Sequence, residues 1–175
     1  MSQKLRTYLS GAMEGAKDGG MGWRDDAKEI AKGLTCVAIL CPKTFNENVD
    51  TENPGWRDRK SHTDELYMQC IRRLIRRDIS LLRSSDVCLV KWDKDAEKSV
   101  GTHSEMTDAF LAGKKVYLIT GTAKVNNLPA WVIGVTDKYF KTISTALKTI
   151  HEEGNKLPAK KPDKINVNTG GLASV

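Results

Sequence analysis

Five short apolar segments alternate along this chain with longer segments that have the residue spacing of helices. Such alternation is typical of βα units, in which a helix connects each strand to the next parallel strand by a right-handed crossover. The sequence therefore predicts an α/β three-layer sandwich with a five-stranded parallel sheet, in flavodoxin-like or Rossmann-like order. The predicted strands are Leu5 to Leu9, Thr35 to Leu40, Asp86 to Trp92, Val116 to Thr120 and a short strand near Tyr139.

Helices are predicted between these strands from apolar spacing and from glycines that follow the last periodic residue. They cover Trp23 to Gly33, Asp64 to Arg83, Glu105 to Ala112 with Gly113 as its stop, and a last helix that ends near Glu153. The segment from Lys43 to Thr63 is polar and contains the turn signal Asn53-Pro-Gly55. Pro42 is expected to end the second strand, and the polar segment is predicted to be a long loop that forms a lid or rim.

The length of 175 residues fits one domain, predicted over residues 1–154. Lys, Pro, Asn and Gly dominate residues 155–175, which are predicted to form a tail or an arm that wraps a partner. The first residues do not resemble a secretory signal and no long apolar run exists, so a cytoplasmic protein is expected. The four cysteines form no CxxC pair, and neither disulfides nor zinc are predicted.

The formal net charge of +6 raises the question of nucleic-acid binding. The excess lies in one predicted helix and in the tail, and no aromatic residues are interleaved with it as a base-stacking surface would require. Solvated helix faces are the favoured interpretation, and a phosphate-bearing small substrate is compatible with this charge. The basic clusters are Arg72, Arg73, Arg76 and Arg77, and Lys156, Lys160, Lys161 and Lys164.

Glu105 follows the third predicted strand, in the motif Gly101-Thr-His-Ser-Glu105, where a helix is expected to start. Open α/β sheets bind ligands beyond the carboxyl ends of their strands, so this carboxylate is a candidate functional group. Gly101 allows a ligand to approach the backbone, and amides there could hold sugar hydroxyls or a phosphate. A structural alternative is a capping box of Thr102 and Glu105.

Asp78 falls on the apolar face of the helix predicted from Asp64 to Arg83. A carboxylate that faces a core needs a partner or a raised pKa, and either outcome is useful to catalysis. The structural alternative is an ion pair with Arg76 or Lys91 at the helix edge.

Two aromatic residues near the ends of the first predicted elements are further candidates. Tyr8 ends the first strand and could orient a neighbouring carboxylate, or be a half-buried aromatic residue. Trp23 could stack on a base or anchor the core. No metal spacing links His62, His103 and His151, no catalytic triad can be assembled, and the Gly11 to Gly22 turn matches no dinucleotide or P-loop motif. No cofactor is predicted.

Taken together, the motifs resemble those of the nucleoside 2-deoxyribosyltransferase family, over roughly Leu5 to Ile150. They occur in the family's order: Tyr8-Leu-Ser-Gly-Ala12, Asp78, Ser85-Asp86, Gly101-Thr-His-Ser-Glu105, Ala109, Gly113-Lys114, Asn127-Leu-Pro-Ala-Trp131 and Gly134-Val-Thr-Asp137.

The resemblance implies that Glu105 attacks the anomeric carbon of a 2-deoxynucleoside and forms a covalent deoxyribosyl-enzyme, after which another nucleobase or water takes the sugar. Covalent catalysis of this kind divides one difficult glycosyl transfer into two easier steps. By the same resemblance, Asp78 binds the departing base and helps to protonate it. Tyr8 holds Glu105 in its attacking orientation.

The resemblance also implies a substrate-binding set, which is Gly11, Trp23, Ser99, Gly101, Thr102 and Asn127. Trp23 would line the base pocket, and Asn127 would contact the sugar of a neighbouring protomer, which implies a homo-oligomer with shared active sites. Ser99 departs from the pattern, because the family has an acidic residue there that contacts the sugar. The small neutral side chain would reduce the repulsion of a 5′-phosphate.

Two other functions remain open at the level of sequence. One is an N-glycoside hydrolase of nucleosides or their 5′-monophosphates on the same fold, with water in place of the acceptor base. The other is a non-catalytic nucleotide-binding module, since a fold does not fix a function.

Overall fold

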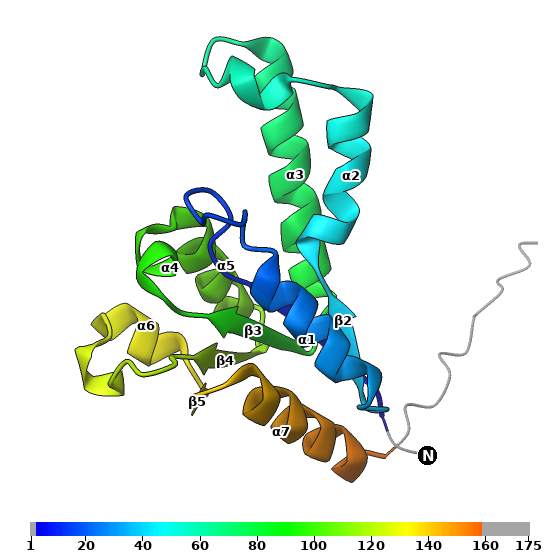
Figure 1. The fold of residues 1–175 in the computed structure, drawn as a ribbon, viewed down its shortest axis with the longest axis vertical. Helices are drawn as coiled ribbons and strands as arrows, with labels where there is room; N and C mark the ends of the chain where they lie inside the picture. The colour runs from blue at the N-terminus through cyan, green and yellow to red at the C-terminus, as the bar shows by residue number, and fades with distance from the viewer. Residues whose placement is uncertain (1–2, 159–175) are drawn as a thin grey trace, which may run out of the picture.

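The computed structural model describes residues 3–158, apart from the side chains of residues 45–48, and contains a five-stranded parallel sheet (Figure 1). The order across the sheet is β2-β1-β3-β4-β5, and every neighbouring pair is parallel. This order confirms the predicted α/β class, and of the two predicted orders it is the flavodoxin-like one. The strands are β1 (Leu5–Ser10), β2 (Val37–Leu40), β3 (Val87–Lys91), β4 (Lys115–Ile119) and β5 (Lys138–Phe140).

Helices cover both faces of the sheet, and the alternation of side chains along each strand gives each face its own core. On β1, Tyr8 packs with residues of the face covered by α3 (Glu65–Arg83), α5 (Val100–Leu111) and α6 (Ala130–Val135). Leu9 packs into the opposite core, beneath α1 (Gly22–Lys32) and α7 (Ile143–Lys156). Successive residues of β1 therefore pack into different cores, and Tyr8 belongs to the core beneath α3, α5 and α6.

The predicted loop from Lys43 to Thr63 is wrong, because this segment forms the helix α2 (Pro42–Glu52) and the 3₁₀ helix η1 (Trp56–Arg59). Pro42 occupies the first turn of α2, where a missing backbone N–H costs nothing, so the residue that was expected only to end a strand begins a helix. Together with α3, these elements form an arm that projects from the sheet (Figure 1). The arm has its own small core of Val49, Trp56, Cys70 and Leu74.

Other predictions about the helices are partly confirmed. Gly33 and Gly113 follow the ends of α1 and α5 as expected, and Gly113 adopts a φ of +66° that suits glycine. Ile75 is an apolar residue of α3 that lies at the surface, with a relative exposure of 54%. The four cysteines are buried free thiols.

The C-terminal part of the chain is described as far as residue 158. Helix α7 continues through Lys156, so it extends beyond the predicted domain boundary at Gly154. Most of the predicted tail lies outside the described residues. Among the described residues, no helix combines the length and the apolar character needed to cross a membrane.

Candidate active site

Two hydroxyl groups of β1 hold the carboxylate of Glu105. The Tyr8 hydroxyl donates to Oε1 over 2.7 Å, and the Ser10 hydroxyl donates to Oε2 over 2.5 Å. Each carboxylate oxygen therefore has its own donor, which fixes both the position and the rotation of the group. Glu105 is half-buried, whereas Tyr8 and Ser10 are fully buried.

The sheet topology explains why these three residues meet. Tyr8 and Ser10 are two positions apart on β1, so their side chains lie on the same face of the sheet. Helix α5 follows β3, which pairs directly with β1, and α5 crosses that same face. The chain builds β2 on one side of β1 and β3 on the other, so Glu105 lies at the switch point of the sheet, where open α/β folds bind ligands.

Helix α5 begins earlier than the sequence predicts. It starts at Val100, with Ser99 as the N-cap residue whose hydroxyl accepts from the backbone N–H of Thr102 over 3.3 Å. The predicted capping box of Thr102 and Glu105 is therefore wrong. Glu105 lies beyond the first turn, and its carboxylate is bound to β1 instead of to the helix terminus.

Burial raises the pKa of Glu105 from its usual 4.5 to about 7. The Ser10 and Tyr8 hydrogen bonds oppose this increase, because they stabilise the ionised carboxylate. The negative charge of Asp78 raises the pKa further, and the positive charge of Arg24 lowers it. Glu105 therefore exchanges its proton near neutral pH.

Asp78 lies on α3 with its side chain only 15% exposed, in agreement with the predicted core-facing position. Its carboxylate forms a 2.8 Å ion pair with the adjacent Arg77, so the predicted alternatives Arg76 and Lys91 are wrong. Burial nevertheless raises the pKa of Asp78, against the opposing effects of Arg77 and Arg24. Burial and the charges of Glu105 and Asp78 also raise the pKa of Tyr8, so its hydroxyl remains a donor.

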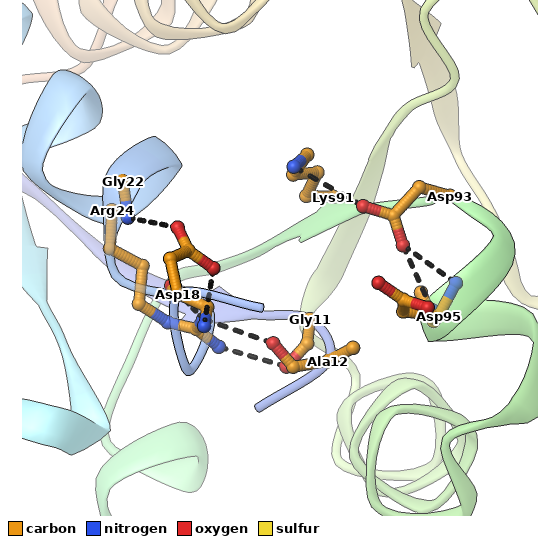
Figure 2. Close-up of polar contacts among 10 residues, drawn as sticks. Gly11, Ala12, Asp18, Gly22, Arg24, Lys91, Asp93 and Asp95 are labelled. Carbon is orange, nitrogen blue, oxygen red and sulfur yellow. Dashed lines mark hydrogen bonds and ion pairs between the residues drawn. The ribbon is translucent and has the colours of Figure 1, made fainter. Parts of the chain in front are cut away.

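Arg24 and the loop that follows β1 form a second set of contacts (Figure 2). The Arg24 guanidinium donates to the carbonyls of Gly20 over 2.6 Å and Gly11 over 2.9 Å, and more weakly to that of Ala12 over 3.5 Å. Asp18 accepts from the backbone N–H groups of Gly20 and Gly22. These contacts hold the loop in a closed turn at the carboxyl end of β1.

This loop forms one wall of a cavity of about 260 Å³. The opposite wall comes from the segment after β3, where Asp93 pairs with Lys91 over 3.2 Å and caps α4 (Lys94–Lys98) (Figure 2). The cavity therefore opens between the carboxyl ends of β1 and β3, but Glu105, Tyr8 and Asp78 are not among the residues that line it. Its lining residues are Ala12, Ala16, Lys17, Asp18, Gly20, Trp23, Lys91, Asp93 and Asp95.

The predicted substrate-binding residues occupy different environments. Trp23 lines the cavity and is 6% exposed, and it packs so tightly against Gly11 that a Cβ there would lie 3.1 Å from its ring. Gly101 is exposed in the first turn of α5, and the buried Thr102 donates to Ser99. Asn127 is exposed in the 3₁₀ helix η2 (Val125–Asn127), and within residues 3–158 no hydrogen bond joins it to Glu105.

Sequence reasoning missed Ser10 and Arg24. The signal for Ser10 was present, because it is two residues from Tyr8 on a strand and so shares its face. Arg24 carried no such signal. A single arginine in the first turn of an amphipathic helix is usually solvated, and its burial depends on the loop that folds over it.

Comparison of the sequence with protein-family profiles and with curated proteins finds no match. Solved structures do resemble it. A 2-deoxyribosyltransferase from Bacillus psychrosaccharolyticus matches with a TM-score of 0.61 and 15% identity, over 83% of this chain and 95% of that one. A conserved protein from Enterococcus faecalis V583 matches with a TM-score of 0.55 and 14% identity, over 86% and 99%.

A CMP N-glycosidase from Clostridium botulinum matches more distantly, with a TM-score of 0.47 and 14% identity over 83% of this chain and 97% of that one. Identities this low establish a likeness of fold alone. At that level the first match agrees with the resemblance read from the motifs. The chain has the fold of a nucleoside 2-deoxyribosyltransferase.

Proposed function

We propose that this protein cleaves the N-glycosidic bond of 2-deoxynucleosides and transfers the sugar to another nucleobase. The observation that carries the proposal is the carboxylate of Glu105, which two hydroxyls orient at the switch point of the sheet. A second half-buried carboxylate, Asp78, interacts electrostatically with it. One ionised and one protonated carboxyl group are the pair that glycosyl transfer with retention requires.

In the proposed first step, a carboxylate oxygen of Glu105 forms a bond to the anomeric carbon while the N-glycosidic bond breaks. The bonding electron pair leaves with the base nitrogen, and the proton of Asp78 is available to neutralise it, because burial raises the pKa of Asp78. In the second step, a nitrogen of the acceptor base attacks the anomeric carbon. As that bond forms, the ester bond breaks and returns its electron pair to Glu105, and the proton of the acceptor nitrogen passes to the Asp78 carboxylate.

Hydrogen bonds from Tyr8 and Ser10 fit this mechanism. They direct the carboxylate and favour its ionised form, which is the form that attacks. The increase in pKa caused by burial acts in the opposite direction, and it makes the carboxylate a stronger nucleophile when it is ionised. The balance of the two effects puts the predicted working range at neutral pH and above.

The test is base exchange with the purified protein. Thymidine and free adenine should yield deoxyadenosine and thymine, measured by chromatography. Glu105→Gln should abolish exchange, and Asp78→Asn should reduce it most for bases that need protonation to leave. Glu152→Gln is the matched control, because Glu152 is exposed on α7, away from the carboxyl ends of the strands. An active Glu105→Gln enzyme would refute the mechanism.

A covalent intermediate provides a second readout. A 2-fluoro sugar analogue of the nucleoside should add one sugar mass to Glu105, located by peptide mass spectrometry, and the Glu105→Gln protein should stay unlabelled. Binding of nucleoside without label or turnover would instead identify a non-catalytic binding module.

A second candidate function is hydrolysis of nucleoside 5′-monophosphates. Two features favour it: the neutral Ser99 caps α5, and Gly101 in the first turn is exposed, so a phosphate could approach the helix N-terminus without meeting a carboxylate there. Incubation of a deoxynucleoside 5′-monophosphate without acceptor base distinguishes the two reactions. Release of base and sugar phosphate, unaffected by added adenine, would favour hydrolysis.

The proposal includes a homo-oligomer in which a neighbouring protomer supplies Asn127 to the sugar. The exposed position of Asn127 is compatible with this role. Sedimentation velocity gives the subunit number. Mixing an inactive Glu105→Gln protein with an inactive Asn127→Ala protein should restore part of the activity if sites are shared between protomers.

A further inference from the structure

Arg24 is a fully buried arginine without a carboxylate partner among residues 3–158. Its relative exposure is 0%, and its side-chain hydrogen bonds within the described residues all go to backbone carbonyls of the loop after β1. The Nε atom is buried without a hydrogen bond. Lys and Arg side chains are rarely buried unless they are paired, so this arrangement requires an explanation.

Three carbonyl dipoles satisfy donors of the guanidinium but do not neutralise its charge. Burial lowers the pKa of Arg24, yet an arginine stays protonated in proteins because its usual pKa is so high. The positive charge therefore remains, and its field acts on groups farther away. Those groups include Glu105 and Asp78, for which Arg24 favours the ionised forms.

The connection to Glu105 is also geometric. Arg24 binds the carbonyl of Gly11, and Gly11 directly follows Ser10, whose hydroxyl donates to Glu105. Gly11 has little freedom to move, because Trp23 and the carbonyl of Lys91 lie 3.1 Å and 3.3 Å from the place that a Cβ would occupy. Arg24 thus holds the strand end that carries one of the two donors to Glu105.

We propose that Arg24 is a positioning residue of this site, which ties the β1–α1 loop to Ser10 and supplies positive charge to Glu105, whereas Asp78 already has Arg77 as its ion-pair partner. The groups around Glu105 are Tyr8 from β1, Cys88 from β3, Asp78 from α3 and Arg24 from α1. Arg24 is the cation in that set. The importance of this charge for catalysis rests on the proposed function. The effect of Arg24 on the ionisation of Glu105 is independent of that function.

The test measures the ionisation of Glu105 directly. With ¹³C-labelled glutamate, the side-chain carboxyl signal of Glu105 is assigned from its disappearance in Glu105→Gln and followed against pH. The wild-type midpoint is expected at about 7. Neutral Arg24→Gln should move it upward, and Arg24→Lys, which keeps the charge, should return it toward the wild-type value.

The matched control is Arg83→Gln. Arg83 is an exposed arginine of α3 that pairs with Asp108 across to α5, so its loss should leave the Glu105 midpoint unchanged. An unchanged midpoint in Arg24→Gln would overturn the proposal, as would equal shifts in Arg24→Gln and Arg24→Lys, since equal shifts indicate a purely structural role. Arg24→Met is the second neutral variant if Arg24→Gln does not fold. If neither folds, a wild-type midpoint in Arg24→Lys supports the charge role, and a displaced midpoint refutes it.

Activity gives an independent readout. If the protein transfers or releases bases, the acidic limb of its kcat/KM profile should shift upward in Arg24→Gln with the same sign as the titration. If the wild-type protein has no such activity but the titration shifts as expected, the proposed function fails and the role of Arg24 stands. If the activity depends on Glu105 but the Glu105 midpoint is unchanged in Arg24→Gln, the proposed function stands and the proposed role of Arg24 fails.

Discussion

The phenolic hydroxyl of Tyr8 donates a 2.7 Å hydrogen bond to Oε1 of Glu105, although the two residues lie 97 positions apart in the chain. The bond joins the central strand β1 to the helix that follows the neighbouring strand β3. The hydrogen bond stabilises the ionised carboxylate of Glu105. It also raises the pKa of Tyr8, so the tyrosine keeps the proton that it donates.

Tyr8→Phe should lower kcat/KM by about 10- to 100-fold, because a hydrogen bond to a charged group contributes about 1.5–3 kcal/mol. The phenyl ring keeps its place in the core, so the melting temperature should change little. Tyr139→Phe is the control, since that hydroxyl binds a backbone carbonyl of α6. Equal losses of activity in both variants would contradict a specific role for Tyr8.

Ser10→Ala should shift the acidic limb of the kcat/KM profile. The Ser10 hydrogen bond lowers the pKa of Glu105, so its removal should raise that pKa above about 7 and reduce activity mainly on the acidic side. A shift of about one pH unit corresponds to a loss of roughly 1.4 kcal/mol. Rates measured from about pH 5 to pH 9 would reveal it, and a uniform loss at every pH would argue against this mechanism.

Glu105→Gln should stabilise the folded protein at alkaline pH. The folded protein holds the Glu105 proton up to about pH 7, whereas the unfolded chain loses it near 4.5, so the wild-type protein loses stability as the pH rises between these values. The free energy of unfolding of the variant minus that of the wild type should therefore be larger at about pH 8 than at about pH 4, by up to about 3 kcal/mol. Urea denaturation at both pH values measures this difference.

Glu153→Gln should have the opposite effect. Burial opposes ionisation of Glu153, but hydrogen bonds from Lys138, Tyr117 and Lys115 lower its pKa to about 2. Its contribution is therefore fully present above the unfolded value of 4.5 and is lost as the pH falls through about 2. The variant should be less stable than wild type by about 1–3 kcal/mol at neutral pH, and the difference should shrink below about pH 4. If the Glu105 and Glu153 variants both became more stable, or both less stable, than the wild type at alkaline pH, the opposite pKa shifts assigned to the two residues would be contradicted.

Gly154→Ala should destabilise the docking of α7 on the sheet. A Cβ at this position would lie 2.6 Å from the carbonyl oxygen of Gln3 and 2.8 Å from the Cβ of Cys36, so the helix would have to move away. Overpacking of this kind costs about 1–3 kcal/mol. The control is Gly134→Ala in α6, where a Cβ meets no atom within 4 Å and helix propensity should add up to about 1 kcal/mol. Thermal unfolding of the two variants should therefore shift in opposite directions.

Local patterns in the sequence were enough to predict the layers of this protein. Strand alternation and helical spacing are local patterns, so the five strands, the main helices and their glycine stops could be predicted before any contact was known. The ordered motifs also singled out Tyr8, Asp78 and Glu105 as candidate site residues, and the structure brings Tyr8 and Glu105 into contact. The helix α2 escaped prediction because Pro42 at a helix start and a proline that ends a strand look alike in sequence.

Which side chains are in contact depends on the tertiary structure. Ser10 meets Glu105 across 95 positions, Asp78 takes the adjacent Arg77 instead of Arg76 or Lys91, and Arg24 is buried under a loop that closes over it. The physical reason is that periodicity assigns a side chain to a face, whereas its partner and its degree of burial depend on segments that packing brings together from distant parts of the chain. The pKa of Glu105 follows from that packing, and no local pattern encodes it.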